Sequence, residues 1–109
     1  MPPLPGLSNL QFLVLGLLLE EPRSGRELRA SLQIHGARKS TPAFYQLMAR
    51  MEDAGLVDGH YAQHEAADQI VRERHYRVTP AGRRAWRASH EFHLEVASWI
   101  QPTPARLHA

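Results

Sequence analysis

The segment from Thr41 to Gly55, TPAFYQLMARMEDAG, constrains the fold most, because its pattern suits only an α-helix. Its apolar side chains recur at i, i+3, i+4 and i+7, which places them on one helix face: Phe44, Leu47, Met48 and Met51. Thr41 is predicted as the N-cap, and Pro42 suits the first helical position. Gly55 is placed for the left-handed turn that ends a helix. The segment therefore predicts a helix with one buried face and one polar face.

Composition and charge limit the class of protein. A chain of 109 residues fits one domain, at a size where oligomerisation often adds buried surface. The formal net charge of +2 permits an anionic partner without requiring one. Because there is no cysteine, disulfides, thiolate metal sites and cysteine nucleophiles are excluded. The apolar run at residues 12–19 is short of the roughly 20 residues that span a bilayer, so we expect a cytoplasmic protein without a membrane partner.

Two further helices are predicted before this segment. Residues 8–11 and 24–27 both carry a capping-box pattern, which marks the start of a helix. The first helix is apolar nearly all round up to Pro22, as expected of a central helix. The second has only a narrow apolar stripe, and a short basic connection at residues 37–40 joins it to the Thr41 helix. The second helix and the Thr41 helix, joined by this short connection, predict a helix-turn-helix.

After Gly55 the apolar period changes to two. Residues 56–61 begin an extended segment, and residues 74–78 alternate polar and apolar side chains, which predicts the two strands of a hairpin. The intervening residues 62–73 are expected to form a long loop with its turn near residues 66–69. Thr79 and Pro80 then repeat the helix-start signature, and a last helix is predicted from Pro80 to about Ile100.

Two stretches resemble the PadR-like transcriptional regulators: YQLMARMEDAGLVDG at residues 45–59 and RHYRVTPAGRRAW at residues 74–86. The positions that match the family pattern are Tyr45, Leu47, Met51, Glu52, Gly55, Leu56, Val57, Tyr76, Val78, Thr79 and Gly82. The SGREL segment at residues 24–28 is also similar, and the resemblance covers roughly residues 10–99. The chain departs from the pattern at Arg26, Phe44 and Gln46, and in a longer wing with the acidic residues Glu65, Asp68 and Glu73.

The resemblance implies a mainly α fold with a small β-hairpin (α+β): a winged helix-turn-helix plus a C-terminal dimerisation helix. We expect a flexible N-terminal arm at residues 1–7, a winged helix-turn-helix DNA-binding domain at 8–79, the dimerisation helix at 80–101 and a flexible tail at 102–109. The implied function is a sequence-specific repressor that acts as a homodimer on a palindromic operator in double-stranded DNA. No cofactor is implied.

The residue types predict a DNA surface. The N-terminal half of a recognition helix meets base edges while flanking basic residues hold phosphates. Gln46 can pair with adenine, and Arg38 and Lys39 suit phosphates. The predicted DNA-binding residues are Arg38, Lys39, Ser40, Thr41, Ala43, Tyr45, Gln46, Arg50, Arg72 and Arg74. Two alternatives stay open: Tyr45 covers the hairpin, or Arg50 pairs with an acidic residue at position 52 or 53.

The last helix carries an apolar seam that recurs at steps of four and three, the period at which helices pair lengthwise. The seam consists of Ala85, Ser89, Phe92, Val96 and Trp99. By resemblance, such helices cross at the two-fold axis, and some family members bind planar aromatic effectors between protomers. The candidate residues for an effector or the dimer interface are Trp86, Phe92, Val96 and Trp99. Trp86 lies off the seam, so its return to the protomer's own core is an alternative.

Two rival classes of function were compared. An enzyme is disfavoured because HEAAD and HEFH lack the His-Glu-x-x-His spacing of a zinc site, and no nucleophile–base pair is present. A metal bound by His60, His64 and His75 across the hairpin is a weaker alternative, so we predict neither metal nor catalytic residues. The second rival is a winged-helix module that binds another protein without binding DNA.

Overall fold

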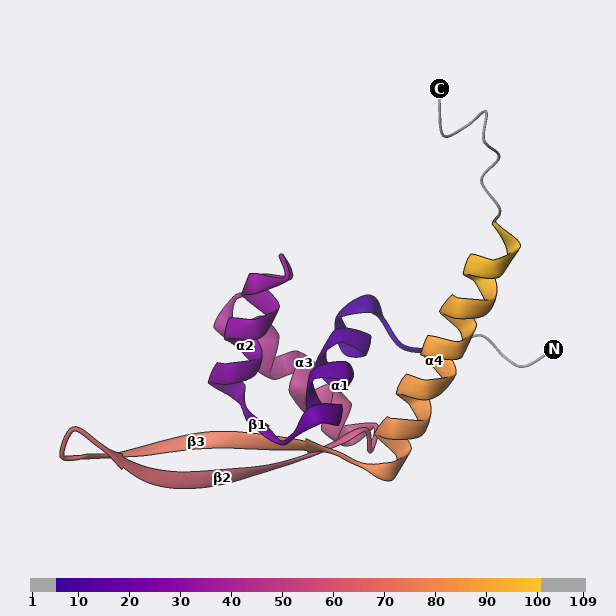
Figure 1. The fold of residues 1–109 in the computed structure, drawn as a ribbon. Coiled ribbons are helices and arrows are strands. Elements are labelled where there is room, and N and C mark those ends of the chain that lie inside the picture. Colours follow the sequence, from indigo (N-terminus) through magenta and orange to yellow (C-terminus); the bar gives the residue numbers. More distant parts are fainter. Residues whose placement is uncertain (1–5, 101–109) are drawn as a thin grey trace.

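The computed structural model describes residues 6–100, apart from the side chains of His64 and Ala66. These residues form α1 (Asn9–Glu20), β1 (Arg23–Ser24), α2 (Gly25–Ile34), α3 (Thr41–Asp53), β2 (Val57–Ala66), β3 (Gln69–Val78) and α4 (Pro80–Trp99). The predicted α+β class with a winged helix-turn-helix is confirmed. Figure 1 shows α1, α2 and α3 gathered beside one end of the sheet, while the β2–β3 hairpin projects beyond them. Most of the predicted arm and the whole predicted tail lie outside the described residues.

Every helix begins at a hydroxyl residue whose oxygen accepts a backbone N–H one turn ahead. The predicted capping box of α1 is present, because the Ser8 Oγ accepts from the Gln11 N–H while the Gln11 side chain accepts from the Ser8 N–H. The N-cap predicted for α3 was wrong by one residue. Ser40, not Thr41, caps the helix by accepting the Ala43 N–H at 3.3 Å. Adjacent hydroxyl residues compete for this role, and only the backbone path decides between them.

The core lies where α1, α2 and α3 meet the root of the hairpin. The predicted inward face of α3 is confirmed, since its four apolar residues are all at most 5% exposed. They pack with the buried residues of the other elements: Val14, Leu15, Leu18, Leu28, Leu32, Val57 and Tyr76. Gly55 has a φ of +74° and ends the helix as predicted. This packing fixes α3 with its opposite face outward.

The hairpin differs from the expected long loop. Apart from the turn, residues 62–73 belong to β2 and β3, which are 10 residues long each. The two strands pair from Val57 opposite Val78 to Ala66 opposite Gln69. The turn is where it was predicted, at Ala67 and Asp68, and both have a positive φ. Backbone pairing extends the strands beyond the core, so apolar alternation does not report their length.

A third strand, β1, was not predicted. Its two residues pair with β3, opposite Tyr76 and His75, and give the sheet order β1-β3-β2. A strand of two residues is too short to produce a recognisable alternation in the sequence.

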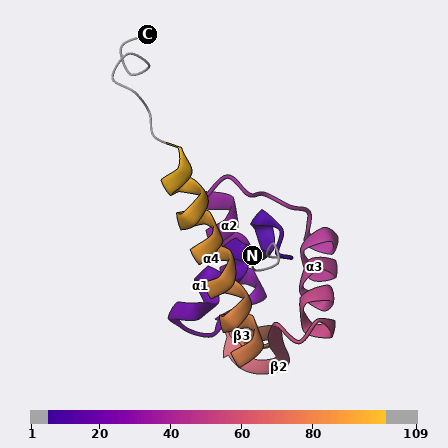
Figure 2. The same ribbon diagram turned by 90° about the vertical axis from the view of Figure 1, so that its right-hand side faces the viewer.

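The start of α4 packs on α1, and its end extends past the helical body (Figures 1 and 2). Ser89 of the predicted seam is only 2% exposed, and the Trp86 ring stacks on Phe12 with 5.3 Å between centroids. The first half of the seam is therefore used within the protomer, and Trp86 joins the core as the sequence alternative proposed. No helix within residues 6–100 combines the length and apolarity that a bilayer crossing requires.

Candidate nucleic-acid interface

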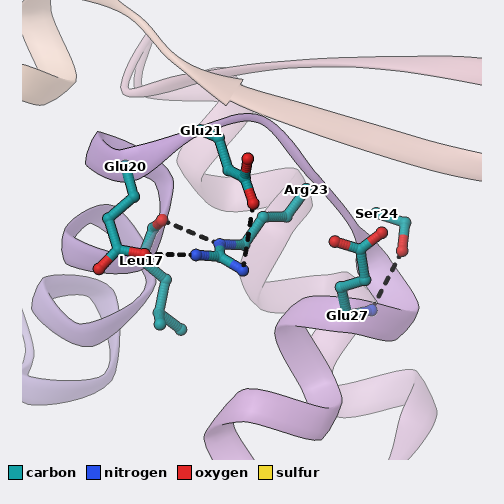
Figure 3. Close-up of polar contacts among 6 residues, drawn as sticks. All are labelled: Leu17, Glu20, Glu21, Arg23, Ser24 and Glu27. Carbon is teal, nitrogen blue, oxygen red and sulfur yellow. Dashed lines mark hydrogen bonds and ion pairs between the residues drawn. The ribbon is translucent and has the colours of Figure 1, made fainter.

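The corner between α1 and α2 sets the orientation of α2 (Figure 3). The Arg23 Nε donates to the Leu17 carbonyl at 3.0 Å, and its Nη2 donates to the Glu20 carboxylate at 2.6 Å. One residue later, the Ser24 Oγ accepts the Glu27 N–H and starts α2. The guanidinium thus joins the last turn of α1 to β1. Since α2 begins directly after β1, this corner fixes where α2 starts relative to α1.

The exposed face of α3 presents Gln46 and Arg50, and Tyr45 lies at its edge with 36% of its surface exposed. The Tyr45 ring meets Phe44 edge-on at 5.0 Å between centroids. Its hydroxyl lies above Gly25, where an added Cβ would be 2.6 Å away. Tyr45 therefore covers the start of α2, and Gly25 leaves the room that it needs.

Four of the predicted residues line one hollow, which we call the basic hollow. It lies between α2 and the N-terminal end of α3 and has a volume of about 540 Å³. Its lining residues are Arg29, Leu32, Gln33, Ala37, Arg38, Lys39, Ser40, Thr41 and Phe44. Three of these side chains are cationic and none is acidic. Arg29 was not among the predicted residues, because its place on α2 looked like an ordinary polar helix face.

A second hollow, the wing hollow, lies between α2, α3 and the hairpin and has a volume of about 340 Å³. Its lining residues are Gly25, Arg26, Arg29, Thr41, Tyr45, Tyr61, Val71, Arg72, Glu73 and Arg74. Arg29 and Thr41 belong to both hollows, so the two form one surface around the first turn of α3. Of the predicted DNA-binding residues, Ala43, Gln46 and Arg50 lie outside this lining, farther along α3.

Arg74 is held by α3 to a degree that the sequence did not indicate. Its Nη2 donates to both Glu52 carboxylate oxygens, at 2.6 and 2.9 Å, and its guanidinium lies near the Tyr61 and Tyr76 rings. Burial opposes the charge of Arg74, but the hydrogen bond and charge of Glu52 outweigh it and raise its pKa. Glu52 pairs with Arg74. The alternative of an Arg50–Glu52 pair is absent from the ion pairs of the described residues. The pair ties the hairpin to α3.

Arg72 lies farther out on the hairpin and is exposed. Its guanidinium carbon lies 4.2 Å from the centre of the Tyr61 ring, a cation–π distance. The ring restricts the side chain while leaving its donors accessible. An acidic neighbour of this region, Glu73, pairs instead with Arg26 at 3.6 Å.

The predicted effector and dimer residues divide into two groups. Trp86 is stacked between Phe12 and His90 inside the protomer. Phe92 and Val96 are half-buried, whereas Trp99 is 62% exposed on the extending half of α4. The free half of α4 therefore carries three of the four residues.

The histidines of the weaker metal alternative are only partly described. The rings of His60 and His75 lie side by side with centroids 6.0 Å apart. The side chain of His64 lies outside the described set, and the side chains that are described include no group of three metal-ligating residues.

Comparisons with known proteins identify similar chains. The family model "Transcriptional regulator PadR-like family" matches residues 14–88. A PadR family transcriptional regulator from Eggerthella lenta is 30% identical, with a TM-score of 0.64 over 82% of this chain and 76% of that chain. A PadR family regulator from Clostridium difficile is 15% identical, with a TM-score of 0.72 over 84% and 93%. Bacillus subtilis PadR in complex with operator DNA is 17% identical, with a TM-score of 0.63 over 89% and 51%. No curated protein matches.

Proposed function

Because this chain belongs to the PadR-like family of transcriptional regulators, we propose that it is a repressor that binds a palindromic operator as a homodimer in the cytoplasm. Members of the family are transcriptional regulators with a winged-helix DNA-binding fold and are not enzymes. The observation that carries the proposal is the continuous basic surface around the first turn of α3, formed by the basic hollow and the wing hollow. The B. subtilis relative was solved with operator DNA, which supports the same partner here.

The exposed face of α3 would enter the major groove, which is about 12 Å wide and admits one helix. Its first turns then bring Thr41, Tyr45 and Gln46 toward base edges. The phosphates on either side would be held by Arg38 and Lys39. In the wing, Arg72 is the contact to the backbone or minor groove, since its donors are accessible. We assign Arg74 mainly to holding the wing in place, because its Nη2 already donates to both Glu52 carboxylate oxygens.

A dimer is proposed because one recognition helix reads only half of a palindrome, whose halves lie about 34–36 Å apart. The extending half of α4 supplies the pairing surface, with Phe92, Val96 and Trp99 on one face. A planar aromatic effector is proposed to stack on Trp99 between the protomers. In a Trp86→Phe variant only Trp99 emits, and planar aromatics should quench it saturably. Absence of quenching would assign Trp99 to dimer packing alone.

The DNA proposal is tested by fluorescence anisotropy with a duplex from the protein's own upstream region, over a series of salt concentrations. The double variant Arg38→Ala/Lys39→Ala should bind more weakly on every sequence. Its slope of log affinity against log salt should fall by about 1.8, since each phosphate contact contributes about 0.9.

The matched control is Arg83→Ala/Arg84→Ala, which removes the same charge from exposed positions of α4. It should leave the slope nearly unchanged. Equal slopes for wild type and the Arg38/Lys39 variant would remove the basic hollow from the interface. Failure of the wild type to bind any duplex at low salt would favour the rival protein-binding module.

A further inference from the structure

We propose that Arg29 is a phosphate-binding residue and that the basic hollow receives one phosphate group through it. The phosphate is that of a DNA backbone, so this inference rests on the proposed function. Arg29 is partly buried on α2, and its Nε lies under neighbouring atoms without a hydrogen-bond partner. Buried polar atoms are nearly always paired, and an unpaired charged donor is costly. The Arg29 charge is therefore not satisfied within residues 6–100, and its guanidinium is available to an anion in the basic hollow.

The charges around the hollow select an anion. Arg29 faces the same space as Arg38 and Lys39, and no carboxylate lines it. The ion pairs among residues 6–100 include none of these three side chains, so their charges are not neutralised inside the protein. Like charges that share one hollow repel each other. A bound anion attracts all three cations, and these attractions offset the repulsion between them.

The first turn of α3 contributes less than a helix end usually does. The Ser40 Oγ already accepts the Ala43 N–H, the Phe44 N–H donates to the Ser40 carbonyl, and Pro42 has no N–H. Thr41 is left with its own N–H and hydroxyl. The helix dipole of α3 and these two Thr41 donors bind an anion only weakly without a guanidinium beside them, so the site depends on Arg29. An arginine can present its two Nη groups together to two phosphate oxygens, while its Nε stays covered.

The shape of the hollow favours a phosphate attached to a chain over a free one. At about 540 Å³ it is open and far larger than a single phosphate, so it cannot enclose and dehydrate a free ion. A duplex backbone that crosses the opening can place one phosphate inside while its neighbours stay in solvent. That phosphate would lie beside Thr41, at the end of α3 that meets the bases. It would therefore set how far α3 enters the groove.

The test compares Arg29→Met and Arg29→Lys with wild type on a duplex of random sequence, over a salt series. Arg29→Met should bind about tenfold to hundredfold more weakly, as expected for a hydrogen bond to a charged group. Its salt slope should fall by about 0.9. Arg29→Lys keeps the charge without the paired guanidinium donors, so it should retain most of the slope and still lose affinity. The matched control Arg87→Met removes an exposed charge from α4 and should leave the slope unchanged.

A direct readout is the 15N–1H signal of the Arg29 Nε, assigned by its absence in Arg29→Lys. It should shift when the random duplex is added and stay unchanged with inorganic phosphate at the same phosphate concentration. This signal keeps the test valid even if Arg29→Met fails to fold. A shift with inorganic phosphate but not with the duplex would overturn the DNA backbone as the source.

Two failures can be told apart. If both Arg29 variants bind like wild type while Arg38→Ala/Lys39→Ala is weakened, only the role of Arg29 is overturned. If the wild type binds no duplex, the proposed function is overturned, and the role of Arg29 in binding a DNA phosphate is overturned with it.

Discussion

At the scale of single residues, the junction of α3, β2 and α4 depends on one hydroxyl and one glycine. The Thr79 Oγ1 donates to the Gly55 carbonyl at 2.6 Å and accepts the Gly82 N–H at 3.0 Å. At Gly82 an added Cβ would lie against the Leu56 carbonyl and 2.8 Å from a Val78 methyl carbon. The Leu56 carbonyl itself accepts the Thr79 N–H, so it cannot move away freely. A side chain at position 82 would push α4 off the hairpin root.

We expect Gly82→Ala to lower the free energy of unfolding by about 1–3 kcal/mol, the usual cost of overpacking. Helix propensity alone predicts the opposite sign, a gain of at most about 1 kcal/mol. Urea denaturation of both proteins measures the difference. The matched control is Ala88→Gly at an exposed position of α4, which should cost only the propensity difference. A stabilised Gly82→Ala variant would show that α4 has room to shift.

At the scale of elements, the hairpin is a long two-stranded arm that the core supports only at its root. Val57 and Tyr76 are buried there, and the Glu52–Arg74 ion pair fastens β3 to α3 two residues farther out than Tyr76. Beyond Tyr61 the strands rely on backbone pairing and a two-residue turn. Ala67 and Asp68 occupy that turn with φ values of 51° and 62°, which favour glycine or asparagine. The end of the arm should therefore open more readily than its root.

We expect the double change Ala67→Asn/Asp68→Gly to slow amide hydrogen exchange in the outer half of the hairpin, because an Asn-Gly pair suits two positive φ values. The gain should be about 1–2 kcal/mol, with little change in the exchange of α1 and α3. Faster exchange in the outer pairs, for instance at Glu65 and Ile70, would contradict this account of the turn. Asp68→Ala, which keeps a non-glycine residue at a positive φ, is the control.

At the scale of the whole molecule, two elements extend beyond the body, and its principal extents are 63 × 33 × 23 Å. The hairpin is one, and the extending half of α4 is the other (Figure 1). That half of α4 and its C-cap, Ile100, expose large apolar side chains: Leu94 at 58%, Trp99 at 62% and Ile100 at 67%. Exposed apolar side chains in a group are typical of an interaction surface. This supports α4 as the dimerisation helix that the sequence predicted.

We expect Val96→Glu to shift the protein to monomers, because a carboxylate in an apolar seam loses its hydration without gaining a partner. Light scattering coupled to size-exclusion chromatography measures the mass, and operator affinity should fall with it. Ser98→Glu introduces the same charge off the seam and should leave the mass unchanged. A Val96→Glu protein that stays dimeric would place the interface elsewhere.

The sequence by itself determined the order of the elements, the approximate ends of the helices and the buried face of α3, whereas the choice of Ser40 over Thr41 as the N-cap of α3 needed the backbone path. Caps, Pro42 and Gly55 act through bonds between residues a few positions apart, so the local pattern contains them. Only the tertiary structure decided which charges are available. Arg74 is predicted as a DNA contact from its charge, and the structure shows that its Nη2 also donates to Glu52, 22 residues earlier. Arg29 looked like an ordinary polar residue in the sequence, whereas in the fold its Nε is buried and it lines both hollows. Contacts between distant segments set burial and pairing, and no local periodicity records them.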